Sequence, residues 1–146
     1  MAVWFQDVVD ALQMLSQDDR YYYDSHLDEL VYLSVGETGL ESREVLEEEI
    51  EEDVMGRFVR LLTYYDFNPY TFMERYVYHL PDGDLSDRLS RAIRGHGVFR
   101  RFKSELERYD RLEDWYAFEA QCYEELVLDW CQENEIAIVD NQLKKI

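Results

Sequence analysis

The sequence has few of the residues that break or cross-link a chain. Its 146 residues include two prolines and six glycines, which argues against long loops and favours helix. Its longest apolar runs are a few residues, far short of the ~20 that a membrane-spanning helix needs. The N-terminal segment MAVWFQDVVDAL lacks a basic leader and is interrupted by acids, so we do not read it as a signal peptide. These absences predict a chain without membrane segments that resides in the cytoplasm.

Cysteine is scarce as well. Cys122 and Cys131 lie nine residues apart in a stretch that reads as one helix, which places them on roughly opposite sides and ~13 Å apart along the axis. A disulfide needs Cα atoms within ~7 Å of each other, so these two cannot bridge. We expect both to be reduced, one buried and one less so. His26, His79 and His96 stand far from both in the sequence, so we expect no metal site and no cofactor.

Recognisable catalytic motifs are missing too. His79 and His96 have no neighbouring Ser or Cys in a nucleophile motif, and the sequence has no Walker or Rossmann glycine pattern and no HExxH. The acid-rich segment 41–53 lacks the alternating acids and central glycine of an EF-hand loop. We therefore expect a protein that is not an enzyme.

Positive charge is in short supply and unevenly distributed. The chain has 15 Lys and Arg against 33 Asp and Glu, a net charge of −18. The segment from Arg88 to Arg111, however, contains eight Lys and Arg and three acids. The net charge of this segment is +5, and the net charge of the rest of the chain is −23. This segregation is the main functional clue in the sequence.

The hydrophobic content is high enough for a folded core. Apolar residues make up 47% and aromatics 15% of the chain, and the length suits one domain over residues 1–146. Apolar residues at helical spacing predict a helix over 3–15. The runs YYYD (21–24) and ELVYLS (29–34) predict an antiparallel hairpin, which residues 35–39 end. A short helix over 41–53 and a short strand over 57–62 follow.

From Asn68 onward the pattern is helical. Asn68 and Pro69 are suited to cap and open a helix that stops at Pro81. Further helices are expected from Asp84 to a left-handed cap at Gly95, from about Gly97, and from Leu112. The segment IAIV (136–139) either returns as a strand or packs without one. The sequence thus predicts an α+β fold with an N-terminal helix, a small antiparallel sheet built on the hairpin, and a mostly helical C-terminal half.

The basic segment has two interpretations that the residues leave open. In one, it lies against the acidic run 41–53 and relieves the repulsion there. In the other, it binds an external phosphate, because IRGHGVFRRF resembles a helix–hairpin–helix element in which glycine amides and a helix N-terminus hold a nucleic-acid phosphate. The sequence departs from that element at His96 and Arg94, and the net charge disfavours nucleic acid as a partner. The candidate anion-binding residues are Gly95, His96, Gly97, Arg100, Arg101 and Lys103.

The acidic and tyrosine-rich parts of the chain predict contact with a protein. Twelve tyrosines cannot all be buried, and exposed tyrosine beside carboxylate suits an interaction surface. The candidate contact residues are Glu47, Glu48, Glu51, Glu52, Tyr64 and Tyr65. Our main interpretation is an acidic cytoplasmic protein-interaction or regulatory domain. The alternatives are phosphate or nucleic-acid binding through residues 88–111, and an inhibitor whose acidic surface imitates nucleic acid.

Three stretches also carry a family resemblance: AIRGHGVFRRFKSEL (92–106), WYAF (115–118) and DWCQENEI (129–136). They are similar to the blocks of a bacterial family known as uncharacterised protein family 0158, from which Ser104 departs where aspartate is more typical. The family has no established activity, so the resemblance implies a self-contained domain and leaves function open. Within the first block, Phe99 and Phe102 are expected to face the core and to hold Arg100 and Arg101 at its border.

Overall fold

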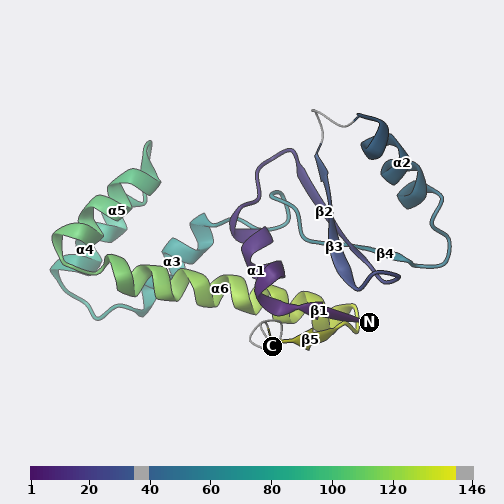
Figure 1. Ribbon diagram of the computed structural model, residues 1–146. Helices are drawn as coiled ribbons and strands as arrows, with labels where there is room; N and C mark the ends of the chain where they lie inside the picture. The colour runs from purple at the N-terminus through teal and green to yellow at the C-terminus, as the bar shows by residue number, and fades with distance from the viewer. Residues whose placement is uncertain (35–39, 141–146) are drawn as a thin grey trace. The chain divides into compact units, whose positions relative to one another are not determined.

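Residues 1–34 and 40–140 are described by the computed structural model of the chain (Figure 1), with side chains for all of these except 34 and 40–43. The expectation that residues 35–39 end the hairpin lies outside the described residues. The chain divides into two compact units: unit 1 is Met1–Phe67 with Tyr123–Ile146, and unit 2 is Asn68–Cys122. The prediction of one domain over 1–146 means that the two units unfold together in one cooperative transition, and it stays a prediction.

Unit 1 begins with a short strand that the sequence patterns did not predict. Strand β1 (Ala2–Trp4) precedes helix α1 (Phe5–Gln13), so the helix expected over 3–15 begins later than predicted. Strand β1 pairs in parallel with β5 (Ala137–Val139), and Val3 lies opposite Ile138. The backbone of Val3 and Trp4 is extended because it pairs with β5, a strand far along the chain. The expectation that IAIV could return as a strand is confirmed.

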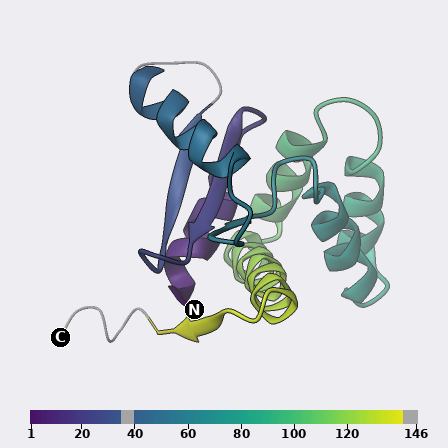
Figure 2. The same ribbon diagram turned by 90° about the vertical axis from the view of Figure 1, so that its right-hand side faces the viewer.

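The predicted hairpin is confirmed. Strands β2 (Asp19–Asp24) and β3 (Glu29–Ser34) are antiparallel. Strand β4 (Phe58–Arg60), inside the segment expected as a strand, pairs with the other edge of β2 and gives the sheet order β3-β2-β4. Helix α2 (Leu40–Glu51) forms in the acidic run and contacts β3 (Figure 2). The helices and this small antiparallel sheet confirm the α+β class.

The core of unit 1 joins segments from both ends of the sequence. Its fully buried side chains come from α1, from β2, from the residue that follows β4 and from the second part of helix α6 (Leu112–Glu133). The Trp130 indole N–H donates a 2.9 Å hydrogen bond to the carbonyl of Arg60, which ties α6 to the end of β4. The fully buried residues of this core include Val8, Val9, Leu12, Tyr23, Leu61 and Val127.

Unit 2 is helical, as predicted. It contains α3 (Tyr70–His79), α4 (Asp84–Ala92), α5 (Val98–Arg108) and the first part of α6. The predicted start of α3 is displaced by one residue: Pro69 is the N-cap and Tyr70 the first helical residue, and Asn68, which was expected as the cap, precedes them. Asn68 Oδ1 accepts a 3.0 Å hydrogen bond from the Tyr70 N–H at this helix start. Among the described residues, no helix has both the length and the apolar content that crossing a membrane requires.

An aromatic cluster forms the centre of unit 2. The Tyr76 ring meets Phe102 at 6.2 Å, Trp115 at 5.4 Å and Phe118 at 5.4 Å, edge to face in each case. The Tyr76 hydroxyl donates a 2.7 Å hydrogen bond to Asp114 Oδ2. Burial, and then the Asp114 carboxylate, raise the pKa of Tyr76, so this tyrosine is a neutral core residue at physiological pH.

Two burial expectations need correction. Phe99 was expected in the core, but it is 54% exposed, whereas Phe102 is 1% exposed. Phe99 lies in the first turn of α5, one turn before the helix enters the core at Phe102. Cys122 and Cys131 are both thiols outside any disulfide and are both buried, so neither is the less buried residue that the sequence predicted. They face the cores of different units, and burial raises the pKa of Cys131 to about 11.

Candidate functional site

A pocket of about 570 Å³ lies in unit 1, where α1 meets the β2–β3 hairpin. We call it the acidic pocket. It is lined by Val3, Trp4, Asp7, Asp10, Ala11, Met14, Asp19, Tyr21, Asp28, Glu29, Leu30 and Tyr32. These residues include five carboxylates and three large aromatic side chains, and none of them is Lys, Arg or His.

The α1 wall of the acidic pocket follows from helical periodicity. Asp10 and Ala11 follow Asp7 by three and four residues, Met14 follows Ala11 by three, and the four residues share one side of the helix. The opposite face carries Val8, Val9 and Leu12, which are buried in the core. Because that face is held in the core of unit 1, the two aspartates are directed into the pocket.

The hairpin wall follows from strand alternation. Tyr21 and Tyr32 are directly opposite each other in the β2–β3 register and on the same face as Asp19. Their ring centroids are 5.1 Å apart with the planes tilted by 47°. The Tyr32 hydroxyl donates a 2.6 Å hydrogen bond to Asp19 Oδ1, which orients the ring along the wall. Tyr32 is 50% exposed, so this wall is open to solvent.

Two carboxylates of the acidic pocket, those of Asp19 and Asp28, are held in their charged form by hydrogen bonds. The Tyr32 hydroxyl, aided by the Ser16 N–H at 2.9 Å, lowers the pKa of Asp19. The Tyr23 hydroxyl, followed by the Ala2 N–H, lowers the pKa of Asp28. Burial, and then the Asp19 carboxylate, raise the pKa of Tyr21. At neutral pH the hairpin wall therefore presents anionic carboxylates beside neutral aromatic rings.

This combination of groups is suited to binding an organic cation. Carboxylates accept short, charge-assisted hydrogen bonds from ammonium and guanidinium groups, and aromatic faces attract cations that lie within ~6 Å of the ring centre. Over the described part of the chain, no cluster of three or more His, Cys, Asp or Glu side chains is arranged to hold a metal ion. The five carboxylates are distributed around the walls and can contact an extended cationic chain at several points.

The acidic pocket was missed at the sequence level because charge was considered in runs. Asp7 and Asp10 belong to no run, and neither do Asp19 and Asp28. A usable signal was present: acids three apart on α1, opposite its apolar stripe, together with the alternation of Asp19, Tyr21 and Tyr23. What no pattern supplied was the packing of that helix face against that hairpin face.

The predicted contact residues lie elsewhere in unit 1. Glu48, Glu51 and Glu52 are exposed on and just after α2, and Glu47 is half-buried. Tyr64 and Tyr65 are 41% and 68% exposed, and their rings meet edge to face at 5.6 Å. Their side chains are accessible, and their role in binding a partner stays a prediction.

One acid near α2 is structural. Asp24 is 1% exposed and accepts hydrogen bonds from Arg57 Nε at 2.9 Å and Nη2 at 2.8 Å, and from the His26 N–H at 2.9 Å. These hydrogen bonds from Arg57 are the largest of the interactions that lower the pKa of Asp24. Arg57 Nη1 also lies 3.7 Å from Glu49, so this arginine provides part of the counter-charge of the acidic run.

In unit 2, the predicted Gly-His-Gly turn is present between α4 and α5. Gly95 and Gly97 have φ of +85° and +66°, the left-handed conformation that glycine adopts without strain, and His96 is exposed between them. Helix α5 begins directly afterwards at Val98. The turn therefore has the geometry expected from the sequence.

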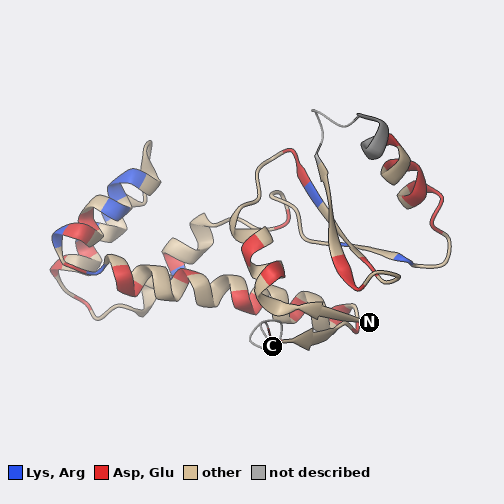
Figure 3. Cartoon of the chain, in the orientation of Figure 1, with Lys and Arg blue, Asp and Glu red and all other residues tan. Residues whose placement is uncertain are grey.

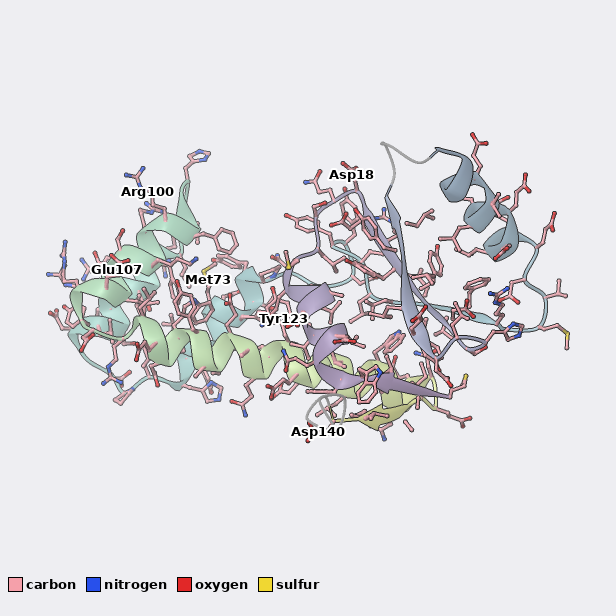
Figure 4. The ribbon with its side chains drawn as sticks, in the orientation of Figure 1. Asp18, Met73, Arg100, Glu107, Tyr123 and Asp140 are labelled. Carbon is pink, nitrogen blue, oxygen red and sulfur yellow. The ribbon has the colours of Figure 1, made fainter. Side chains whose placement is uncertain are left out.

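The three cations after the turn point in different directions. At ~100° per residue, Arg101 and Lys103 lie on opposite flanks of α5 and Arg100 lies between them on the outer side, which it shares with Glu107 (Figure 4). The Arg101 guanidinium donates a hydrogen bond to the carbonyl of Arg94. The Lys103 ammonium lies 5.7 Å from the centre of the Tyr116 ring. Of these three cations, only Arg101 is hydrogen-bonded to a residue next to the Gly-His-Gly turn.

The acidic run and the basic segment belong to different units, and each has acid–base contacts of its own (Figure 3). In unit 2, Arg88 lies 3.7 Å from Asp84 and 3.9 Å from Glu105, and Arg108 lies 3.8 Å from Glu105. The two interpretations of the basic segment, as a partner of residues 41–53 or of an external anion, both stay predictions.

The comparisons with known proteins give one match. The model of the family described as "Uncharacterised protein family (UPF0158)" matches residues 1–145. No curated protein matches the chain, and no solved structure does. The resemblance seen in the three sequence blocks is thereby confirmed over nearly the whole chain.

Proposed function

The chain belongs to the uncharacterised protein family UPF0158, and we propose that it is a non-enzymatic interaction or regulatory module that binds a cationic segment of a partner protein in the acidic pocket. One observation carries the proposal. Five carboxylates and the rings of Trp4, Tyr21 and Tyr32 line one pocket to which no basic residue contributes. The proposal thus gives the acidic interaction domain expected from the sequence a specific binding site.

The size and exposure of the acidic pocket support a basic side chain as its occupant. Its volume of about 570 Å³ falls within the ~300–1,000 Å³ typical of small-ligand sites. Met14 and Tyr32 are 80% and 50% exposed, so a partner can reach the pocket from solvent. An arginine or lysine side chain can place its stem on the aromatic rings and its charged head against the carboxylates.

The charge of the whole chain supports the same kind of partner. A net charge of −18 attracts basic proteins at long range and speeds their association, most strongly at low salt. The acidic pocket then supplies what charge alone does not, namely a fixed geometry that favours one cationic residue over a diffuse basic surface.

The direct test is a titration with a peptide that carries several arginines and lysines, against a peptide of equal length in which they are replaced by alanine. We expect saturable binding of the basic peptide only. Asp10→Asn removes one carboxylate of the pocket and should weaken binding about tenfold, the value of one charge-assisted hydrogen bond of ~1.5 kcal/mol.

Asp18→Asn is the matched control. Asp18 is exposed in the turn before β2 (Figure 4) and is not among the pocket residues. The variant changes the net charge by the same amount as Asp10→Asn, so it should weaken binding by less than about twofold, the level expected for an exposed charge. Equal losses in the two variants would show that general acidity, and not the pocket, binds the peptide.

A second candidate function uses the surface of α2. Exposed Glu48 and Glu51 on α2, together with exposed Tyr64 and Tyr65, support an inhibitor that imitates nucleic acid. It is distinguished by the double change Glu48→Gln/Glu51→Gln, which leaves the acidic pocket intact. If this variant loses the ability to compete with DNA for a basic protein while Asp10→Asn retains it, the imitation of nucleic acid is the better account.

The absence of catalysis is part of the proposal and has its own test. A screen against nucleotides, phosphoesters and peptides should give no turnover. Turnover that is lost in His96→Ala or Arg100→Ala would replace the binding module with an enzyme. A cytoplasmic location is also proposed, because cysteines that form no disulfide, at positions 122 and 131, suit a reducing compartment, and cell fractionation can check it.

A further inference from the structure

A second pocket, of about 240 Å³, lies in unit 2 between α4 and α5. It is lined by Arg88, Arg91, Ala92, Arg101 and Glu105, and we call it the arginine pocket. Three of its five lining residues are arginines, in a chain whose net charge is −18. Only Arg101 of the six residues that the sequence suggested for anion binding belongs to it.

Helical spacing brings these side chains together. Arg91 and Ala92 follow Arg88 by three and four residues and lie on the same side of α4, and Arg101 and Glu105, four residues apart, share one face of α5. The Arg101 guanidinium is held at the end of α4 by its hydrogen bond to the Arg94 carbonyl. Ala92 is buried and small, which leaves space between the longer side chains.

The arginines have hydrogen-bond capacity left over. Each guanidinium carries five N–H donors. Arg88 approaches Asp84 and Glu105 only to 3.7 and 3.9 Å, which is beyond hydrogen-bond distance. Arg88 Nε and Glu105 Oε2 are both buried without a hydrogen-bond partner among the described residues. Asp84 is itself engaged by the Tyr109 hydroxyl at 2.7 Å.

We propose that the arginine pocket binds a single phosphoryl group of a small, water-soluble molecule. Guanidinium groups donate paired hydrogen bonds to phosphate oxygens, and three arginines against one glutamate give the pocket a charge of +2. Its volume of about 240 Å³ is below the ~300 Å³ at which drug-sized sites begin. One phosphate with a small substituent therefore matches the space.

The charge of the rest of the chain favours a small anion over nucleic acid. Beyond ~8–10 Å the carboxylates of the chain are largely screened at physiological salt, so a compact anion meets mainly the local field of the arginines. A nucleic acid extends over many such lengths and is repelled by the whole acidic surface. This site is independent of the acidic pocket and of the function proposed for it.

The test is a titration of the full chain with inorganic phosphate at constant ionic strength, followed by NMR of the arginine Nε–Hε groups. We expect saturable shifts for Arg88, Arg91 and Arg101 and smaller ones elsewhere. Arg91→Gln should weaken phosphate binding at least about tenfold, the equivalent of one charged hydrogen bond. Arg100→Gln is the matched control, because Arg100 lies on the outer side of the same element as Arg101; it should change the affinity less than about twofold.

Glu105→Gln gives a test in the opposite direction. It removes the one negative charge of the arginine pocket and raises the pocket charge from +2 to +3. Phosphate affinity should rise severalfold, a result that a purely structural role of these arginines does not produce. Unchanged melting temperatures in the three variants will show that differences in affinity are not due to unfolding.

Several results would overturn the proposal. One is the lack of any saturable phosphate shift, and another is an equal loss in Arg91→Gln and Arg100→Gln. Shifts confined to the amides of Gly95, His96 and Gly97 would move the anion to the turn. Arg91-dependent binding of an oligonucleotide, or of vesicles that contain phosphatidic acid, without binding of free phosphate would assign the arginines to a larger phosphorylated partner.

Discussion

At the scale of single residues, the buried carboxylate of Asp24 shows how one side chain is stabilised in unit 1. Asp24 has almost no contact with solvent, and it receives two hydrogen bonds from Arg57 and one from the His26 backbone. A carboxylate at such a position needs its partners, because an unpaired buried charge is costly. The stability of unit 1 therefore depends on Arg57, which pairs with Asp24, as well as on the aspartate itself.

Replacing Arg57 should destabilise unit 1 clearly. Arg57→Met leaves the Asp24 carboxylate buried without its ion pair, and we expect a loss of about 2–3 kcal/mol in the free energy of unfolding, below the full value of a buried pair because Arg57 is partly exposed. Arg60→Met is the control: Arg60 pairs with Asp66 at 2.9 Å, but its side chain is 53% exposed, so the loss should stay below about 1 kcal/mol. Denaturant unfolding at neutral pH measures both, and similar losses would contradict the structural role of Asp24.

The same pair predicts a pH dependence. Arg57 lowers the pKa of Asp24 in the folded state from its ordinary value of 3.8. The stabilisation is therefore fully present above pH 3.8 and is lost as the pH falls through the lower, folded-state pKa. The difference in unfolding free energy between the wild type and Arg57→Met should be constant from pH 7 down to about pH 4 and should decrease below that. A difference that instead grows on acidification would be incompatible with this assignment.

Neither residue of this pair could be matched to the other from the sequence. Asp24 was recognised as the end of a predicted strand, and Arg57 as the start of another. Their contact depends on the pairing of β2 with β4, in which Asp24 lies opposite Phe58. That pairing joins two strands between which β3 and α2 intervene in the sequence, and local patterns contain no information about which strands meet.

At the scale of elements, helix α5 shows what periodicity does and does not determine. The spacing of Phe99, Phe102 and Leu106 correctly predicted a helix and the side of it that faces inward. It did not predict how far along that side the neighbouring elements reach. Phe102 and Leu106 are buried, while Phe99 lies one turn too early and is more than half exposed.

Two alanine variants of α5 should therefore behave differently. Phe102→Ala removes a fully buried ring that packs against Trp115 at 4.9 Å, and it should cost about 3–5 kcal/mol in the free energy of unfolding. Phe99→Ala removes an exposed ring and should cost less than about 1 kcal/mol. Thermal or denaturant unfolding of the two variants is the measurement, and a cost at position 99 equal to that at 102 would restore the original expectation that both face the core.

Other elements were predictable because their signals are local. The β2–β3 hairpin combines aromatic and β-branched runs with a short polar connection, and α3 begins where Asn68 accepts the Tyr70 N–H. The acidic pocket and the arginine pocket were not predictable in this way. Each needs faces of two elements to meet, and the sequence specifies the faces separately from their partners.

At the scale of the whole molecule, charge is the dominant property. A net charge of −18 on 146 residues implies self-repulsion in the compact state. Salt at ~0.15 M limits the reach of each charge to ~8 Å, so added salt should relieve much of this repulsion. The melting temperature of the wild type is accordingly expected to rise between low and physiological salt, as long as the ion in use does not bind.

The double change Arg100→Glu/Arg101→Glu tests how the basic segment contributes to this balance. It shifts the net charge by four units, from −18 to −22. If these arginines balance the acidic run 41–53, the melting temperature should fall, and more at low salt than at high salt, because screening removes the difference. We expect this outcome. A melting temperature that is unchanged at both salt concentrations would show that the arginines do not serve as internal counter-charge.

The pairing of β1 with β5 has a consequence for synthesis on the ribosome. Val3 is synthesised before unit 2, but its ladder partner Ile138 is added only after α6 is complete. Unit 2 is continuous from Asn68 to Cys122, whereas unit 1 takes residues from both sides of it. At ~5–20 residues per second, β1 waits for several seconds without its partner strand. A nascent chain arrested at a length at which Cys122 has left the ribosome and β5 has not should therefore protect unit 2 from protease while the N-terminal segment is still cut, which would make unit 1 the last part of the molecule to form.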